Sequence, residues 1–399
     1  MKLPGLYIHI PFCERKCTYC NFNTTDFFED LAQRYCRAVA REVSHWGRKL
    51  VAQPASSFGG LIEQGRPTID TIYFGGGTPS IVEGANLAAI IDACREAFDV
   101  AQEAEVTIEI NPGTFSPLKL KVWRDAGINR ASVGVQSFID AELVALSRTH
   151  TADDARRTVG ALREAGFDNI SLDLIAGLPD QSKKDWEFNL GEALRLGPEH
   201  LSLYLLEVKE GTRLFGQINR GLRPHPDDDL AAEMYTMMCE ATAAAGFEHY
   251  EISNFARVAK SGPAAGDFRS KHNMKYWTGA AFYGLGCGAH SYDGRARWVN
   301  VMKTESYIDA VETTGEAVAE RHELTDQDRA AEALFMGLRL SEGVDVTEFR
   351  SEYGVDVIER YRADIDRFQD AGLIEFSRDR MKLTGAGRLL SNEVFAAFV

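Results

Sequence analysis

The first half of the chain alternates short apolar runs with longer amphipathic segments. In the longer segments apolar residues recur at helical spacing, as at Leu87, Ile90, Ile91 and Cys94, which predicts helices packed on a sheet. Segment 153–166 shows the same spacing and ends in glycine, a common helix terminator. This alternation predicts parallel β/α units. The six runs that we predict as strands are 6–10, 71–74, 106–110, 131–135, 170–175 and 201–206.

A polar or conformationally unusual residue stands at or directly after the end of each predicted strand. In chain order these are Cys13, the glycines 75–77, Glu109, Gln136, Asp173 and Glu207. Residues at the carboxyl ends of all six strands can converge on one site only if the sheet curves toward closure. We therefore predict an α/β fold whose main part is an incomplete (β/α)6 TIM-type barrel.

The β/α alternation becomes irregular after about residue 215. Acidic residues 227–229 predict the start of a helix that ends before Gly246, and 250–255 is predicted as one more strand. Segment 260–266 (KSGPAAG) is predicted as an exposed loop. From about residue 325 a helical segment is followed by a predicted hairpin at 372–383, which resembles a winged helix. The predicted domains are a barrel at 1–220, an extension at 221–320 and a small C-terminal α+β domain at 321–399.

Composition excludes several classes of function. The 399 residues include 44 Lys and Arg against 59 Asp and Glu, a formal net charge of −15. This balance argues against a broad nucleic-acid or anionic-membrane surface. No run approaches the ~18 apolar residues of a membrane span, and residues 1–25 hold no long apolar signal core. Seven cysteines without a secretion signal favour a reducing compartment over a disulfide scaffold, and we expect a cytoplasmic protein.

Three of the seven cysteines form the pattern C-x3-C-x2-C in the segment YIHIPFCERKCTYCNF. They are Cys13, Cys17 and Cys20. Thiolates are soft ligands suited to iron–sulfur clusters, zinc or copper. Three ligands in one short loop leave a coordination position open, which suits chemistry better than structural support. The alternative is a zinc site whose fourth ligand is His9 or a distant residue.

The cysteine spacing resembles the radical S-adenosylmethionine (SAM) superfamily, and YIHIPFC with the later motifs resembles its coproporphyrinogen III oxidase-like branch. The resemblance implies a [4Fe–4S] cluster in which Cys13, Cys17 and Cys20 hold three irons and SAM chelates the fourth. It also implies reductive cleavage of SAM to a 5′-deoxyadenosyl radical. An electron donor such as flavodoxin or ferredoxin is then an expected partner.

The same resemblance assigns a set of SAM contacts. FGGGTP, at 74–79, resembles the motif that holds the amino group of SAM, through Gly76, Gly77 and Thr78. Glycines there let the backbone approach a ligand closely. Glu109 has apolar neighbours on both sides, and a buried carboxylate needs a partner. The remaining contacts that the resemblance implies are Tyr7, Tyr19, Gln136, Arg148 and Asp173, with Tyr19 packing on the adenine.

Two features separate this chain from oxidases of the branch. The oxidase pattern carries a further cysteine two residues after the third ligand, where this chain has Phe22. This departure argues against oxidative decarboxylation and resembles the HemW haem-chaperone group. The segment SKHNMKYW, at 270–277, contains H-N-x-x-Y-W, which in that group is associated with haem binding. By resemblance His272 is the haem ligand, and neutral imidazole suits haem iron. Ser270 replaces a cysteine that many relatives have there.

The resemblance implies a protein that binds a [4Fe–4S] cluster, SAM and haem and transfers haem to an acceptor protein. The alternative is a radical SAM enzyme acting on a tetrapyrrole, either an oxygen-independent coproporphyrinogen III dehydrogenase or a haem-modifying methyltransferase. Cys287 in GLGCGAHSY is expected to pack, and Cys36, Cys94 and Cys239 lie at core spacing in predicted helices. The sequence leaves open the roles of His9 and His290 and the identity of the acceptor protein. It also leaves open whether SAM is cleaved, how haem is attached and whether the chain forms a homodimer.

Overall fold

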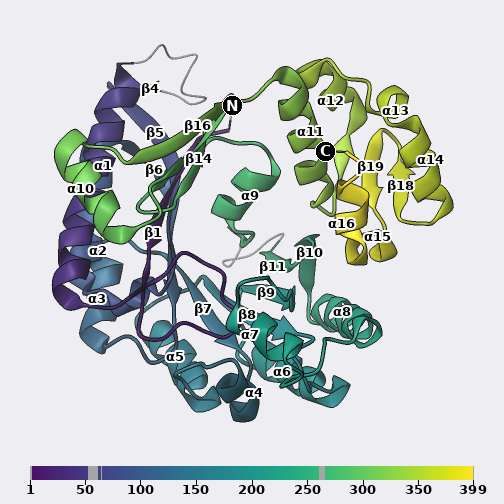
Figure 1. Ribbon diagram of the computed structural model, residues 1–399, viewed down its shortest axis with the longest axis horizontal. Helices are drawn as coiled ribbons and strands as arrows, with labels where there is room; N and C mark the ends of the chain where they lie inside the picture. Colours follow the sequence, from purple (N-terminus) through teal and green to yellow (C-terminus); the bar gives the residue numbers. More distant parts are fainter. Residues whose placement is uncertain (1, 53–61, 64, 260–265, 399) are drawn as a thin grey trace.

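The computed structural model describes residues 2–52, 62–63, 65–259 and 266–398. Figure 1 shows a curved sheet with helices on its outer side and a smaller unit that contains the C-terminus. Of the predicted loop 260–266, only Gly266 lies within the described residues. None of the helices in the described part of the chain is long and apolar enough to cross a membrane.

The six predicted strands are present and parallel, in the order β9-β8-β7-β6-β5-β1. Two of them, β5 and β6, begin earlier than predicted because Thr68 and Ile69 pair with Asp99 and Val100 beyond the apolar runs. The bounds are β1 (Gly5–Ile10), β5 (Arg66–Gly76), β6 (Asp99–Ile110), β7 (Arg130–Gln136), β8 (Ile170–Ala176) and β9 (His200–Leu205).

Amphipathic helices pack on the outer face of these strands. Side chains alternate along each strand, so Ile8, Ile72 and Ile108 enter the core against the helices while Tyr73 and Glu109 face the interior of the barrel. Helices α5 and α6 both start with a capping box, which satisfies free backbone amides. The bounds are α1 (Glu29–Val51), α2 (Gly84–Ala97), α3 (Pro117–Asp125), α4 (Asp140–Ala145), α5 (Ala152–Glu164), α6 (Lys183–Arg195) and α7 (Arg213–Asn219).

The sheet extends past both ends of the parallel core, so it does not close. At one end β13 pairs with β1 in parallel and continues into three antiparallel strands, and at the other end β11 pairs with β9 antiparallel. The predicted incomplete α/β barrel is confirmed. The added elements are β10 (Phe247–Glu251), β11 (Asn254–Ala259), β13 (Phe282–Leu285), β14 (His290–Tyr292), β15 (Ala296–Asn300), β16 (Val318–Glu323) and helices α8 (Asp228–Ala244), α9 (Lys271–Trp277) and α10 (Thr304–Thr314). Short strands are β2 (Phe12–Cys13), β3 (Thr25–Asp26), β4 (Ile62–Glu63) and β12 (Gly266–Asp267).

The single strand predicted at 250–255 is wrong, because this segment contains the turn of the antiparallel hairpin β10–β11. The turn has neither glycine nor proline. Instead the carboxylate of Glu251, a fully buried residue, accepts a 2.9 Å hydrogen bond from the backbone amide of Ser253. The predicted helix after 227–229 is confirmed as α8, with Asp227 accepting from the amide of Leu230.

The C-terminal residues form a second hydrophobic core that includes Leu334, Phe368, Met381 and Phe398. The predicted hairpin at 372–383 is confirmed as β18 and β19. The elements are α11 (Asp326–Leu338), β17 (Val344–Asp345), α12 (Val346–Tyr353), α13 (Val357–Arg360), α14 (Arg362–Asp370), β18 (Ile374–Ser377), β19 (Arg380–Leu383), α15 (Gly385–Leu389) and α16 (Ser391–Phe395). A small α+β unit therefore follows the parallel-strand core.

Candidate cofactor site

A cavity of about 390 Å³ opens at the carboxyl ends of the parallel strands. Strands β5 to β9 each contribute to its lining, and the segment between β2 and β3 covers it with the three clustered cysteines. Most of the residues predicted from sequence are brought together here. They are Cys13, Cys17, Tyr19, Cys20, Gly76, Gly77, Thr78, Glu109, Gln136, Arg148 and Asp173.

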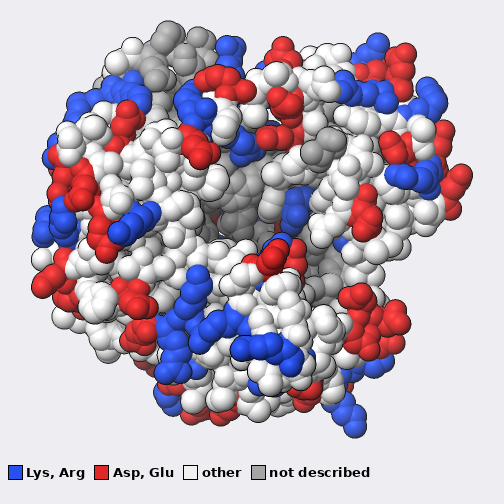
Figure 2. All heavy atoms as spheres, in the orientation of Figure 1, with Lys and Arg blue, Asp and Glu red and all other residues white. Residues whose placement is uncertain are grey.

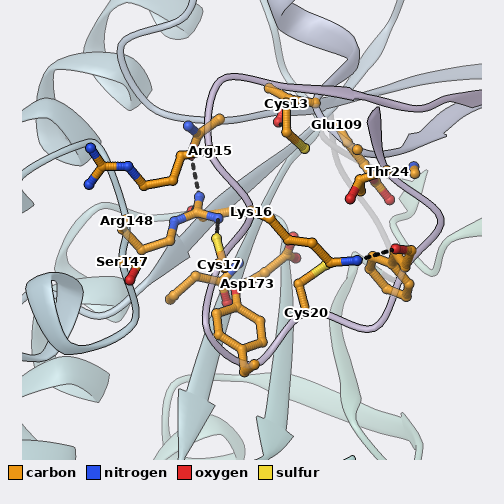
Figure 3. A pocket seen from close by; sticks show the side chains of 18 of the residues that line it. Cys13, Arg15, Lys16, Cys17, Cys20, Thr24, Glu109, Ser147, Arg148 and Asp173 are labelled. Atoms are coloured by element: carbon orange, nitrogen blue, oxygen red, sulfur yellow. Dashed lines mark hydrogen bonds between the residues drawn. The ribbon is translucent and has the colours of Figure 1, made fainter. Parts of the chain in front are cut away.

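The three cysteines lie on one loop that is anchored at several points. The amide of Thr18 donates to the carbonyl of Leu146 at 3.1 Å, and the Thr18 carbonyl accepts from the amide of Leu214 at 2.8 Å. These bonds fix the loop against the end of α4 and the start of α7. Figure 3 shows the side chains of Cys13, Cys17 and Cys20 around one open space, with Glu109 and Asp173 reaching toward it from the strands behind.

None of the three forms a disulfide bond. Burial raises the pKa of Cys13 to about 11 and also raises the pKa of Cys20. Binding of iron therefore has to displace protons from these thiols. The guanidinium of Arg148 donates to the sulfur of Cys17 at 3.5 Å. Three thiols around one space fit a cluster whose irons each take one cysteine.

The glycine loop after β5 is built against the cysteine segment. The amide of Gly77 donates to Ile10 and that of Thr78 donates to Phe12, both at 2.8 Å. A Cβ at Gly77 would lie 2.7 Å from the backbone oxygen atoms of Pro11 and Phe12. Only glycine allows this close approach. The Thr78 hydroxyl lies 3.5 Å from the sulfur of Cys13, so the glycine loop and the first cysteine form one unit.

Glu109 stands at the floor of the cavity. Its Oε1 accepts from the hydroxyl of Tyr73 at 2.8 Å, and its Oε2 accepts from the amide of Gly76 at 3.1 Å. Burial raises the pKa of Glu109 to about 7 despite these bonds, and the nearby carboxylate of Asp173 contributes. A cationic or hydroxyl-bearing ligand would satisfy the ionised form.

A polar wall adjoins Glu109. Burial raises the pKa of Asp173, although Ser132 donates to it at 3.2 Å. Gln136 has a φ of 67°, a left-handed conformation that is costly for a residue other than glycine. Arg148 donates to the carbonyl of Gly134 at 2.7 Å and also to Asn111. These contacts orient Arg148 between the cysteine loop and β7.

The two tyrosines expected at the site differ in their position relative to the cavity. Tyr19 lines the cavity between the second and third cysteines. Tyr7 is outside the lining and lies beneath the glycine loop, where its ring is 3.0 Å from the Cβ position of Gly75. Its hydroxyl lies 3.2 Å from Nδ1 of His9, whose Nε2 is 2.8 Å from the carbonyl of Asn23. The role left open for His9 is therefore to connect β1 to the cysteine segment.

Neither His272, the haem ligand implied by the resemblance, nor His290, whose role the sequence left open, lines this cavity. His290 is exposed on β14. His272 is 1% exposed, and both of its ring nitrogens have hydrogen-bond partners, Thr71 at 2.8 Å and Tyr276 at 3.0 Å. An axial haem ligand needs a nitrogen lone pair directed at the porphyrin. In this conformation His272 does not offer one, so the ligand role expected from the motif does not fit.

Several residues of the site were not predicted from the sequence. Asn111, Ser132 and Tyr204 line the cavity. Ser132 and Tyr204 face it because they keep the two-residue alternation with Gly134 and Ser202 along their strands, which was the available signal. Phe22 lies at the rim and is 61% exposed. Cys287 is buried and does not line the cavity. Its backbone amide donates to the hydroxyl of Tyr35 at 2.9 Å, so its position is consistent with packing.

Comparisons with known proteins give two family matches. The model of the radical SAM superfamily matches residues 7–190, and that of the HemN C-terminal domain matches residues 324–390. Among solved structures, coproporphyrinogen III oxidase (HemN) from Escherichia coli superposes with a TM-score of 0.81 at 22% identity, covering 100% of this chain and 90% of the oxidase. At that identity the likeness concerns the fold alone.

Relatives with closer sequences span the whole chain. "Heme chaperone HemW" of Bacillus subtilis is 35% identical over 398 residues, covering 100% of this chain and 99% of the relative. "Heme chaperone HemW" of Mycobacterium tuberculosis strain H37Rv is 35% identical over 390 residues, covering 98% and 93%. The "Radical S-adenosyl methionine domain-containing protein 1, mitochondrial" of Bos taurus is 35% identical over 351 residues, covering 85% and 74%.

Proposed function

This chain belongs to the HemW family within the radical SAM superfamily, and from that premise we propose that it is a haem chaperone. It binds a [4Fe–4S] cluster, SAM and haem, and it passes haem to an acceptor protein. The observation that carries the proposal is the 35% identity to a HemW relative over 100% of this chain and 99% of that protein.

The proposed cluster ligands are Cys13, Cys17 and Cys20. Each thiolate takes one iron, and the fourth iron is left for SAM in the cavity. When bound, cluster and SAM together supply one-electron chemistry. Arg148 holds its positive charge beside Cys17, while burial raises the pKa values of the Cys13 and Cys20 thiols.

The proposed SAM contacts come from the strand ends. Gly76, Gly77 and Thr78 present backbone and hydroxyl groups to the methionyl end. Glu109 and Asp173 offer carboxylates to the positive charge and hydroxyl groups of the ligand, since burial disfavours their ionised forms and such a ligand would stabilise them. The remaining proposed contacts are Tyr19, Gln136 and Arg148.

Exposed cations and carboxylates both stand at the mouth of the cavity. Arg15 and Lys16 line it beside Glu14, and Lys209 lines it paired with Glu207. Figure 2 shows Lys and Arg gathered below the central hollow of this face, in the region where α7 lies in Figure 1. This charge supports anionic partners at the mouth: the propionates of haem and an acidic electron donor such as flavodoxin or ferredoxin. The free cysteines support a reducing, cytoplasmic location.

The competing function is oxidative decarboxylation of a tetrapyrrole, which the fold would also allow. The observation against it is Phe22, which stands at the rim of the cavity where the oxidase pattern that this segment resembles has a cysteine. An exposed phenyl ring has neither an ionisable proton nor a sulfur atom to contribute at that position. Phe22 offers only an apolar surface.

A haem titration tests the proposal. The anaerobically reconstituted chain, with cluster and SAM loaded, is titrated with haem while the Soret difference spectrum is recorded. Saturable binding with a fixed stoichiometry is the expected result. Haem that partitions without saturation, as it does with unrelated acidic proteins, would exclude a carrier function.

A further inference from the structure

Helix α9, which carries the H-N-x-x-Y-W motif, is fixed to the amino ends of β5 and β6. The carboxylate of Glu105 accepts hydrogen bonds from the amides of Lys271 and His272, both at 3.1 Å. Lys275 donates to Asp70 and, at 2.6 Å, to the carbonyl of Leu3. Figure 1 shows α9 between the sheet and the C-terminal unit. The helix is thus a built part of the barrel and presents no free surface at His272.

The imidazole of His272 is fully enclosed. Burial, with the charges of Lys275 and Arg130, lowers the pKa of His272 to about 3, so the ring is neutral. A neutral ring donates from one nitrogen and accepts at the other. Thr71 and Tyr276 occupy both nitrogens. Release of either nitrogen for a metal would leave a buried hydroxyl without its partner.

One face of the same ring supports Tyr73. The two rings stack with centroids 5.1 Å apart at an interplanar angle of 29°, and the hydroxyl of Tyr73 donates to Glu109 at 2.8 Å. His272 therefore lies one side chain away from the carboxylate at the floor of the cavity. The stack restricts the Tyr73 ring to the position in which its hydroxyl meets Glu109.

A second connection leads from His272 to the cysteine segment. Tyr7 lies 6.3 Å from His272 and 6.1 Å from Tyr73 between ring centroids. The hydroxyl of Tyr7 contacts His9, and His9 in turn contacts the carbonyl of Asn23 beyond the third cysteine. His272 and these tyrosines form one group of rings under the cofactor cavity.

We propose that His272 is a positioning residue for the SAM site, which holds Tyr73 and through it Glu109, and that it is not the ligand of haem iron. The inference rests on the proposed function only in taking SAM as the occupant of the cavity. It assigns the motif histidine to the barrel interior, and it leaves the haem-binding surface to other residues.

The test measures SAM affinity and the change that SAM causes in the electron paramagnetic resonance spectrum of the reduced cluster. His272→Ala removes the stack and is expected to weaken SAM binding about fivefold to tenfold. Tyr73→Phe removes the hydroxyl and is expected to do the same. Because both act through Glu109, the double variant should be weakened by about the same factor as either single variant. Lys271→Ala, an exposed neighbour on α9, is the control and should bind SAM like the parent.

Haem binding is measured on the same proteins. His272→Phe keeps a ring against Tyr73, so it tests the proposal even if the alanine variant does not fold. The expected result is an unchanged Soret band with SAM affinity nearer to the parent than that of His272→Ala or Tyr73→Phe. Loss or displacement of the Soret band while SAM affinity stays within about twofold of the parent would overturn the proposal. If the parent itself shows no saturable haem binding, the chaperone function fails while the SAM measurements still decide the role of His272.

Discussion

The side chain of Asn23 donates to the carbonyl of Cys287 at 3.3 Å and to the carbonyl of Met302 at 2.9 Å. Asn23 follows Cys20, the third cysteine of the C-x3-C-x2-C segment, whereas Cys287 belongs to the glycine-rich segment after β13. The extension of the barrel therefore holds the end of the cysteine loop in place. Cys287, which also contacts Tyr35, is thus buried as part of the segment that supports the cysteine loop.

Asn23→Ala is expected to loosen the cluster without removing a ligand. Two hydrogen bonds to carbonyls are lost, at about 0.5–1.5 kcal/mol each, so the loop opens more often. Iron content after anaerobic reconstitution should fall and bleaching in air should accelerate severalfold. Asn21→Ala, an exposed neighbour in the same loop, is the control. Equal bleaching rates for the two variants would show that Asn23 does not hold the loop.

Single replacement of Cys13, Cys17 or Cys20 by alanine is expected to abolish the [4Fe–4S] spectrum. In the proposed cluster each thiolate would bind a separate iron, so no other ligand would replace it. Cys239→Ala, on α8, is the matched control and should retain iron and acid-labile sulfide. A complete cluster in any of the three variants would mean that the ligand is a different residue.

Gly77→Ala is expected to abolish SAM binding. The added Cβ would meet backbone atoms of Pro11 and Phe12 at 2.7 Å, and backbone cannot rotate away as a side chain can. Overpacking of this kind costs about 1–3 kcal/mol and separates the glycine loop from the cysteine segment. Gly160→Ala, in α5 with open space at its Cβ position, is the control for glycine replacement. Normal SAM affinity in Gly77→Ala would contradict the close approach.

SAM affinity is expected to rise with pH. The pKa of Glu109 is raised from 4.5 to about 7 by burial, so the carboxyl is mostly protonated at pH 6 and mostly ionised at pH 8. The ionised form attracts the positive charge of SAM, and affinity below the pKa changes by up to about tenfold per pH unit. Equilibrium binding across this range measures the effect.

Glu109→Gln should remove the Glu109 contribution to the slope, and an unchanged pH profile in that variant would assign the titration to another group. The stability of the ligand-free protein should show the opposite sign. A carboxyl whose folded pKa is raised is stabilised in its protonated form, so its contribution to the free energy of unfolding is lost as pH rises from 4.5 through 7.

Much of the barrel could be predicted because its strands are short apolar runs that are buried almost throughout, and because helices of clear periodicity flank them. Strand β13 could not, because the glycines around Phe282–Leu285 break the alternation that marks a strand. The hairpin at β10–β11 was missed for a related reason, since its turn depends on the carboxylate of Glu251 and not on glycine or proline. Local sequence does not encode such tertiary contacts.

The site was predictable where residues stand at strand ends. Glu109 and Asp173 interrupt apolar strands, so their convergence depended only on the curvature of the sheet. Tyr7 and His272 are different, because both lie inside the barrel. A motif identifies a residue without showing which of its faces is enclosed, and the burial of His272 follows from how α9 docks on Glu105.

The most direct test of the haem-carrier account measures the amounts of haem and of tetrapyrrole product in a single reaction. The reconstituted chain is incubated anaerobically with SAM, a reductant, haem and coproporphyrinogen III, then separated from free pigment, and both fractions are extracted and quantified by chromatography. The account predicts that haem is retained with the chain. It also predicts that vinyl-bearing product formed from coproporphyrinogen III does not exceed the molar amount of the chain. Vinyl-bearing product in large excess, with no haem retained, would contradict it and identify a decarboxylating enzyme.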